Sequence, residues 1–384
     1  MSNNYDCIVL GVGAMGSSTV YDLAAKRGQK VLGLEKFNIP HAEGSSHGVN
    51  RVIRLAYYED PSYVPLMRRA YELWDEIEEI AGEKLLYRIG SIDAAPAGHE
   101  VFEGSLESCL VHDIPYEVLN HDQVNQRFPG YRMPPGHMAL LQQDGGFLLA
   151  ERSIVAYVNA SLAAGAEIHA RESVLSWEPT GDGVLVCTDR AEYTAEKLVI
   201  TAGAWTAGMV PSLAELTVPE RQVLAWLQPE DPMLFTPENF PVFNAYFDEG
   251  RYYGFPVFGI PGFKIGKYHH LEEVTDPDHM GKGVTREDEE VLRSATAKYF
   301  PKANGNVMTM ATCMFTNSPD EHFIIGVLPN HPQVSVAAGF SGHGFKFGIL
   351  IGRILSDLVV HGTTRWDLSR FRLDRTPTPV IEHW

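Results

Sequence analysis

Residues 5–35 read YDCIVLGVGAMGSSTVYDLAAKRGQKVLGLE, and strand and helix patterns alternate along this stretch. A short apolar run at residues 5–10 leads directly into GVGAMG, and residues 18–28 then carry apolar side chains at helical spacing. Gly28 ends this helix, and residues 30–34 form a second apolar run that Glu35 follows. A right-handed crossover through the helix makes the two strands parallel. The stretch therefore predicts a strand–helix–strand unit of an α/β fold.

The glycines of this unit have the spacing of a dinucleotide-binding turn. Gly11, Gly13 and Gly16 satisfy GxGxxG between strand and helix, which lets the backbone approach a pyrophosphate at the helix N-terminus. Glu35 ends the second strand, where a carboxylate can bind ribose hydroxyls. The alternative is that the glycines only pack a helix against a sheet. NAD and FAD both use this unit, so the turn alone does not choose between them.

Two kinds of pattern alternate along the rest of the chain. Strand and helix patterns typical of a nucleotide-binding sheet return at residues 150–203 and 334–361, whereas residues 221–309 hold aromatic-rich strand patterns. We therefore expect a Rossmann-type domain interrupted by a second, sheet-based substrate domain. The expected ranges are 1–85, 145–220 and 310–370 for the dinucleotide domain, 86–144 and 221–309 for the substrate domain, and 371–384 for a C-terminal tail.

Composition narrows the class of protein and its partners. Of 384 residues, 45% are hydrophobic and 21% are charged, which is typical of a globular protein with a large core. The net charge of −18 would repel nucleic acid and acidic membranes. The four cysteines include no CxxC pair, no basic segment precedes the first apolar run, and no apolar stretch has the length of a membrane span. We expect a cytoplasmic protein with reduced thiols and no metal site.

Four further motifs distinguish the chain from other dinucleotide-binding proteins. They are SSHGVNRVIR (45–54), RYYGFP with FKIGKYHH (251–256 and 263–270), ATCMFTNSPDEHF (311–323) and GFSGHGFKF (339–347). With these motifs the chain resembles the monomeric sarcosine oxidase family, which includes N-methyltryptophan oxidase and the peroxisomal pipecolate or sarcosine oxidases. The resemblance implies a glutathione-reductase-like FAD domain plus a sheet-based substrate domain. It also implies oxidation of the C–N bond of secondary amino acids with oxygen as acceptor.

The resemblance assigns roles around the flavin. Cys313 corresponds to the cysteine that binds the flavin covalently, although a free cysteine is more often a small buried hydrophobe. Lys264 corresponds to the lysine whose charge assists electron transfer to oxygen, whereas a lone strand lysine usually faces solvent. The other residues that the resemblance places among the catalytic group are His47, Arg51, Tyr253 and His269, with His270 as the alternative to His269.

The resemblance also assigns a substrate site. Arg54 and Lys346 match the pair that binds the substrate carboxylate, which a guanidinium fork and a point charge can desolvate together. Gly342, on the substrate side, and Gly344, on the flavin side, precede a helix whose N-terminus could stabilise reduced flavin, or they only permit a tight turn. Phe315 replaces a tyrosine that many relatives carry on the substrate side, which leaves the substrate side chain open.

The resemblance therefore implies an FAD-dependent oxidase of small N-methyl or cyclic secondary amino acids such as sarcosine, acting as a monomer. Oxygen would be reduced to hydrogen peroxide, and the imine product would hydrolyse to aldehyde and amine if acyclic. The enzymatic alternatives are a flavin-dependent dehydrogenase, or an oxidase of L-pipecolate, N-methyltryptophan or a glycated amino acid. An NAD-dependent dehydrogenase or a nucleotide-binding sensor would need no residue corresponding to Cys313 or Lys264.

Overall fold

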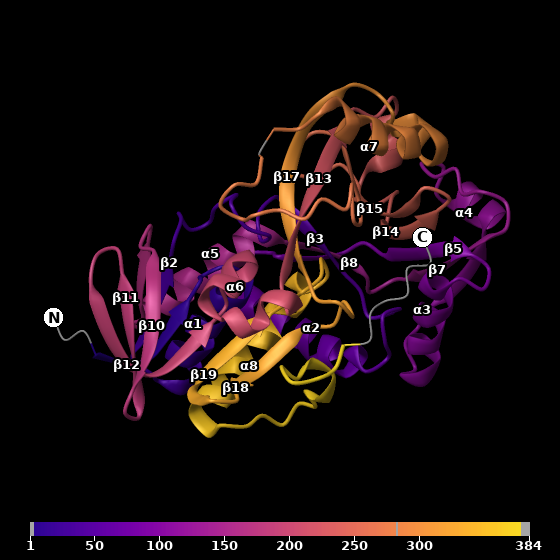
Figure 1. Ribbon diagram of the computed structural model, residues 1–384. Coiled ribbons are helices and arrows are strands. Elements are labelled where there is room, and N and C mark those ends of the chain that lie inside the picture. Colours follow the sequence, from indigo (N-terminus) through magenta and orange to yellow (C-terminus); the bar gives the residue numbers. More distant parts are fainter. Residues whose placement is uncertain (1–3, 282, 378–384) are drawn as a thin grey trace.

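The computed structural model describes residues 4–281 and 283–377. The chain forms two lobes, each built on a large sheet (Figure 1). The part of the predicted C-terminal tail from residue 378 onward lies outside the described residues. No helix in residues 4–281 and 283–377 is long and apolar enough to cross a membrane.

The first sheet is the predicted dinucleotide-binding sheet. β1 lies between β2 and β12 and is parallel to both, so the strand–helix–strand prediction for residues 5–35 is confirmed. β19 continues the parallel order beside β12, and β10 and β11 form an antiparallel hairpin at one side. The strands are β1 (Asn4–Leu10), β2 (Val31–Glu35), β9 (Glu167–Ala170), β10 (Val174–Thr180), β11 (Gly183–Thr188), β12 (Glu192–Ile200), β18 (Ile324–Leu328) and β19 (His331–Ala338).

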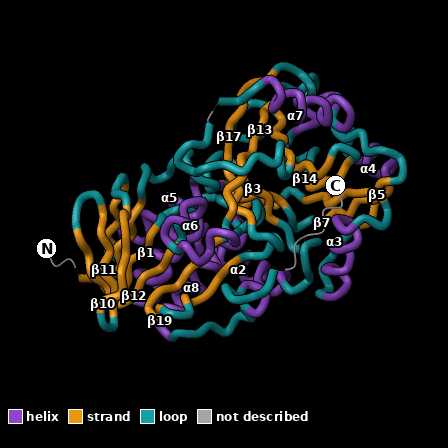
Figure 2. Tube along the Cα trace, viewed as in Figure 1, coloured by secondary structure: helices purple, strands orange, loops and turns teal. Residues whose placement is uncertain are grey.

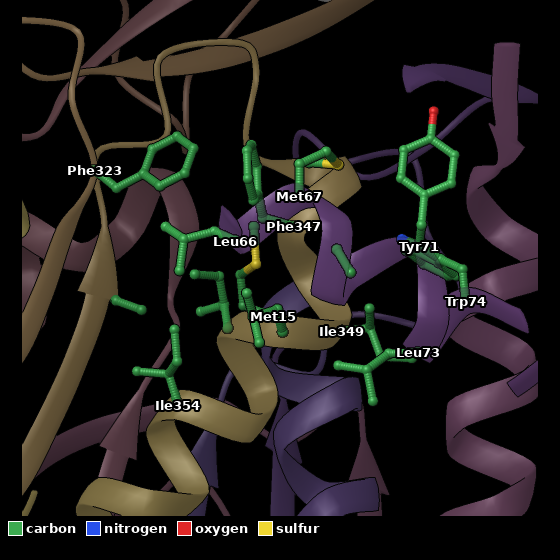
Figure 3. Packing of buried hydrophobic residues seen from close by; sticks show 14 of the residues in the cluster. Met15, Leu66, Met67, Tyr71, Leu73, Trp74, Phe323, Phe347, Ile349 and Ile354 are labelled. Carbon is green, nitrogen blue, oxygen red and sulfur yellow. The ribbon is translucent and has the colours of Figure 1, made fainter. Parts of the chain in front are cut away.

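Helices from distant parts of the chain pack beside this sheet. α1 contacts α5 and α8, and α2 contacts α5 and α8 as well. Figure 3 shows Met15 of α1, Leu66 and Trp74 of α2, and Ile349 of α8 in one apolar cluster. α2 ends at Gly82, whose φ of 62° is the left-handed conformation that glycine adopts without cost. The helices are α1 (Ala14–Tyr21), α2 (Tyr63–Ala81), α5 (Ala150–Ala163), α6 (Thr206–Met209) and α8 (Gly348–His361).

The second sheet has the order β17-β13-β16-β15-β14-β5-β7-β6 and forms the upper lobe in Figure 1. Its core is rich in aromatic rings, as the sequence of residues 221–309 predicts. Its strands are β5 (Ser91–Pro96), β6 (Glu117–Asn120), β7 (His137–Gln142), β13 (Val218–Leu227), β14 (Val242–Phe247), β15 (Gly250–Phe255), β16 (Phe263–Lys267) and β17 (Val307–Asn317), and its helices are α3 (Glu100–Val111), α4 (His121–Arg127) and α7 (Arg286–Tyr299).

The chain passes between the two sheets several times, because each sheet is built from segments that are far apart in the sequence. Figure 2 shows the strands of the molecule in orange and the loops that connect its elements in teal. A small sheet of β3 (Asn50–Ile53), β8 (Gly146–Leu149) and β4 (Leu86–Arg88) lies at one of these passages. The domain boundary expected at residue 310 falls inside β17, which stays paired with β13 as far as Asn317. The chain therefore returns to the first sheet only after β17.

Candidate active site

A cavity of about 620 Å³ is lined by residues of both sheets and of the segments that connect them. Its wall contains the carboxyl ends of β1 and β2 and the inner face of β13–β17, and so lies where parallel α/β sheets bind ligands. Most residues predicted from the sequence are on this wall: Gly11, Gly13, Glu35, Arg51, Arg54, Tyr253, Lys264, Cys313, Phe315, Gly342, Gly344 and Lys346. The wall, as the described residues form it, does not include Gly16, His47 or His269.

One end of the cavity has the features that a dinucleotide requires. Gly11 has a φ of 87°, and a Cβ atom on Gly16 would lie 1.7 Å from the Gly11 carbonyl oxygen. The turn and α1 can therefore pack this closely only with glycine at both positions. The Glu35 carboxylate accepts hydrogen bonds from the backbone N–H groups of Val12 (2.9 Å) and Phe37 (3.0 Å), which hold it beside the turn. A glycine cradle at a helix N-terminus with a fixed carboxylate fits the pyrophosphate and ribose of FAD.

The second sheet provides one long wall of the cavity. Strand register places Asn244, Tyr253 and Gly266 side by side on neighbouring strands. A Cβ atom on Gly266 would lie 2.7 Å from the Tyr253 hydroxyl oxygen, so the tyrosine ring lies across the glycine. Burial raises the pKa of Tyr253, which keeps its hydroxyl protonated.

Lys264 lies on this wall and is 2% exposed. Its Nζ donates hydrogen bonds to the side-chain oxygen of Asn50 (2.9 Å) and to the Asn50 backbone oxygen (3.0 Å). Burial, followed by the nearby charge of Arg51, lowers the pKa of Lys264 well below its usual range. Sequence reasoning missed Asn50 as the partner of Lys264, although its place beside Arg51 in SSHGVNRVIR was a signal.

The segment before Asn50 places the Ser45 backbone oxygen near both Arg51 and Cys313. Arg51 donates to the backbone oxygens of Ser45 (2.9 Å) and His47 (2.5 Å), so its guanidinium holds the shape of this loop. His47 is buried behind the wall, and burial, followed by the charge of Arg51, lowers its pKa to about 4. The Cys313 thiol is buried on β17, 4.0 Å from the Ser45 oxygen, and faces the cavity.

Arg54 and Lys346, the pair predicted to bind a carboxylate, both belong to the cavity wall, and their surroundings contain charges that the sequence did not reveal. Arg54 is 3% exposed and lies 3.2 Å from Glu59 and 3.3 Å from Asp93. Lys346 donates to the backbone oxygen of His343 (2.6 Å) and to the hydroxyl of Tyr57 (3.4 Å). Burial, followed by the charge of Arg54, lowers the pKa of Lys346 to about 7.

A tight turn closes the cavity at the substrate side. Gly342 has a φ of 77°, and a Cβ atom there would lie 2.5 Å from the Phe315 ring. The backbone can approach Phe315 this closely only because residue 342 has no side chain. Gly344 then precedes the short helix that contains Lys346 and leads into α8.

Neither His269, which the sequence places near the substrate, nor its alternative His270 belongs to the cavity wall that the described residues form, whereas Tyr268 does. β16 ends at Lys267, and His269 has a φ of 50°, so the chain turns off the sheet at this point. His269 lies between the carboxylates of Glu220 (2.8 Å) and Glu321 (2.9 Å). His270 contacts Asp288 (3.0 Å) on α7.

Known proteins similar to this chain share its sequence and its fold. The family model described as FAD dependent oxidoreductase matches residues 6–358. The monomeric sarcosine oxidase of Bacillus sp. (strain B-0618) is 38% identical over 381 residues, covering 98% of this chain and 97% of that protein. The N-methyl-L-tryptophan oxidase of Salmonella dublin is 34% identical over 378 residues, covering 97% and 99%. The structure of NikD, described as an unusual amino acid oxidase essential for nikkomycin biosynthesis, superposes with a TM-score of 0.84 at 26% identity and 99% coverage of both chains.

Proposed function

The chain belongs to the FAD dependent oxidoreductase family and is an FAD-dependent amine oxidase, and from this premise we propose that it oxidises small secondary amino acids such as sarcosine with oxygen as acceptor. The observation that carries the proposal is the pair of buried cations, Arg54 and Lys346, on the wall of one cavity with Lys264. We further propose that it acts as a monomer, which the description of its sarcosine oxidase relatives as monomeric supports, and that it acts in the cytoplasm.

The residues that would hold FAD follow the length of the cavity. Gly11 and Gly13 would hold the pyrophosphate, Glu35 the ribose, and the turn at Gly344 the flavin end. When bound, FAD supplies the acceptor for the two electrons removed from the C–N bond. Cys313 would hold the flavin through a thioether to a ring methyl group, because its thiol faces the cavity from a strand on the same wall as Lys264. The thiol S–H and one methyl C–H bond would break, and their two electrons would pass to oxygen, which the proposed reaction already uses as acceptor.

The two cations explain why the substrate would be an amino acid. A carboxylate moved from water into this cavity loses its hydration, and only charged donors compensate for that loss. Lys346 has three N–H donors and uses two of them on His343 and Tyr57, so one remains for a ligand. The guanidinium of Arg54 already contacts Glu59, Asp93 and the Ala56 backbone oxygen, so a substrate carboxylate would bind to its remaining N–H donors.

The same charges prepare the substrate amine. Burial and nearby cations favour the neutral form of an amine, and only the neutral nitrogen can release the electrons of its C–N bond. No base at Cα is required. Lys264 would stabilise the negative charge that develops on oxygen, because its buried Nζ is held in place by Asn50 and can donate a hydrogen bond or a proton to that charge.

Hydrogen peroxide release from matched substrate pairs tests the proposal. We expect turnover of sarcosine, L-proline or L-pipecolate, and poor turnover of the decarboxylated counterparts dimethylamine, pyrrolidine and piperidine. Arg54→Lys and Lys346→Met should each lower kcat/KM about 30-fold or more, since a buried charge pair is worth ~2–5 kcal/mol. Equal kcat/KM within each pair would refute the carboxylate assignment. Substrate-dependent dye reduction without peroxide would assign a dehydrogenase instead.

A further inference from the structure

A buried acid–amide pair lies directly behind the proposed carboxylate site. Asp93 on β5 and Asn244 on β14 are opposite each other in the sheet, and Asn244 Nδ2 donates to Asp93 Oδ1 at 3.0 Å. Asp93 is 0% exposed and Asn244 is 4% exposed, and Asn244 belongs to the cavity wall. The other oxygen of Asp93 approaches no solvent, so this pair must satisfy its hydrogen bonds within the protein.

Each partner has one oxygen that lacks a donor. Among the described residues, nothing donates a hydrogen bond to Asp93 Oδ2 or to Asn244 Oδ1, and both atoms are fully buried. Asp93 and Asn244 are already joined by one hydrogen bond, and each has one acceptor oxygen without a donor. A single added proton can therefore form a second hydrogen bond between them. A proton on Asp93 Oδ2 can be donated to Asn244 Oδ1, which turns the pair into a cyclic acid–amide dimer with both oxygens satisfied.

The charges around Asp93 provide a reason for the proton to bind with substrate. Arg54 lies 3.3 Å from Asp93 and 3.2 Å from Glu59, so two carboxylates face a guanidinium and the nearby Lys346 ammonium. Cys109 on α3 also faces Asp93, and burial raises the pKa of this thiol to about 12, so it stays neutral. When Lys346 is protonated, these two cations and two carboxylates cancel before substrate arrives. A substrate carboxylate would add an uncompensated negative charge in a buried site.

We propose that Asp93 takes up one proton when a carboxylate binds to Arg54 and Lys346, forming the cyclic pair with Asn244 and freeing the charge of Arg54 for the ligand. The proton comes from solvent and is bound at Asp93 Oδ2. Asp93 is thus a positioning residue that acts through Arg54. Burial, which outweighs the neighbouring charge of Arg54, raises the pKa of Asp93 to about 6, in the direction that this uptake requires. The inference rests on the proposed carboxylate site.

The test uses the holoenzyme and methoxyacetate, which has a carboxylate but no amine to oxidise or titrate. Calorimetric titrations at pH 7.5 in two buffers of different ionisation enthalpy count the protons taken up. Asp93→Asn mimics the protonated state, because an amide at residue 93 can donate to Asn244 Oδ1. We expect the wild type to take up nearly one proton more than Asp93→Asn. We also expect the variant to bind methoxyacetate at least tenfold more tightly than the wild type at pH 8.5.

Lys346 is the other group that can gain a proton, and Lys346→Met separates its contribution. Equal proton uptake by wild type and Asp93→Asn would refute the inference, even if loss of affinity in Arg54→Lys upheld the carboxylate site. If methoxyacetate did not bind to the wild type, the carboxylate site itself would fail. Infrared pH titration then still decides the role of Asp93. A protonated carboxyl band that appears below about pH 7 in the wild type and is lost in Asp93→Asn supports protonation of Asp93. Identical spectra of the two proteins overturn it.

Discussion

His269 offers a quantitative test of what the structure assigns to it. The imidazole lies between Glu220 and Glu321, and its side chain is 19% exposed. Burial by itself would lower the pKa of His269, but hydrogen bonds to the two carboxylates outweigh burial and raise it to about 9. The protonated histidine therefore joins β13 to the loop after β17. Its removal should reduce the stability of the fold rather than the chemistry of the cavity.

The size and the pH dependence of this loss of stability follow from the raised pKa of His269. A group with a folded pKa above its unfolded value of 6.5 stabilises the fold fully below pH 6.5 and loses this contribution as pH rises through 9. The linkage relation gives about 3 kcal/mol near pH 6, ~2.5 kcal/mol at pH 7 and ~0.5 kcal/mol at pH 9. His269→Gln should therefore lower the free energy of unfolding by about 2 kcal/mol more at pH 7 than at pH 9.

Urea unfolding of the holoenzyme, followed by circular dichroism at pH 6, 7 and 9, measures this difference. His361→Gln removes an exposed imidazole at the end of α8 and serves as the matched control, with no comparable loss. His269→Gln should retain most of its kcat/KM at 25 °C. A destabilisation that is the same at all three pH values would refute the ion-pair reasoning. A kcat/KM that falls 100-fold with unchanged stability would place the imidazole in the reaction instead.

Three further changes test the cavity wall. Lys264→Met should slow reoxidation of the flavin by oxygen at least tenfold more than its reduction by substrate, because the buried charge acts on oxygen; stopped-flow traces that show equal slowing of both half-reactions would argue against this. Cys313→Ser should release its flavin on acid precipitation whereas the wild type and Cys187→Ser keep it, and a wild-type band without flavin fluorescence on a denaturing gel would exclude the thioether. Gly266→Ala should lower the free energy of unfolding in urea by ~1–3 kcal/mol, because its Cβ would lie 2.7 Å from the Tyr253 hydroxyl. Gly208→Ala is the control and should not lower it, because a Cβ at residue 208 meets no atom within 4 Å. Equal stabilities of the two variants would contradict the close packing at Gly266.

The local sequence was enough to predict the structure wherever a backbone conformation requires particular residue types. The glycines of residues 11–16 and the strand–helix–strand pattern of residues 5–35 depend on neighbours in the chain, and the structure reproduces both. The motifs around Arg54, Lys264, Cys313 and Lys346 led to the cavity wall, because a family resemblance carries three-dimensional information that spacing alone does not contain.

The tertiary structure alone decided which charges compensate one another. Asp93 and Glu59 contact Arg54 only because β5 and the loop after β3 meet at one end of the cavity, and nothing in their local sequence marks them. Tyr268 rather than His269 belongs to the cavity wall, and this depends on where β16 ends. Neighbouring residues of a strand point to opposite faces, so a difference of one residue at the strand end changes which side chain faces the cavity. Strand patterns fix which residues are buried, whereas the pairing of buried charges across strands depends on sheet order and register, which only the folded chain determines.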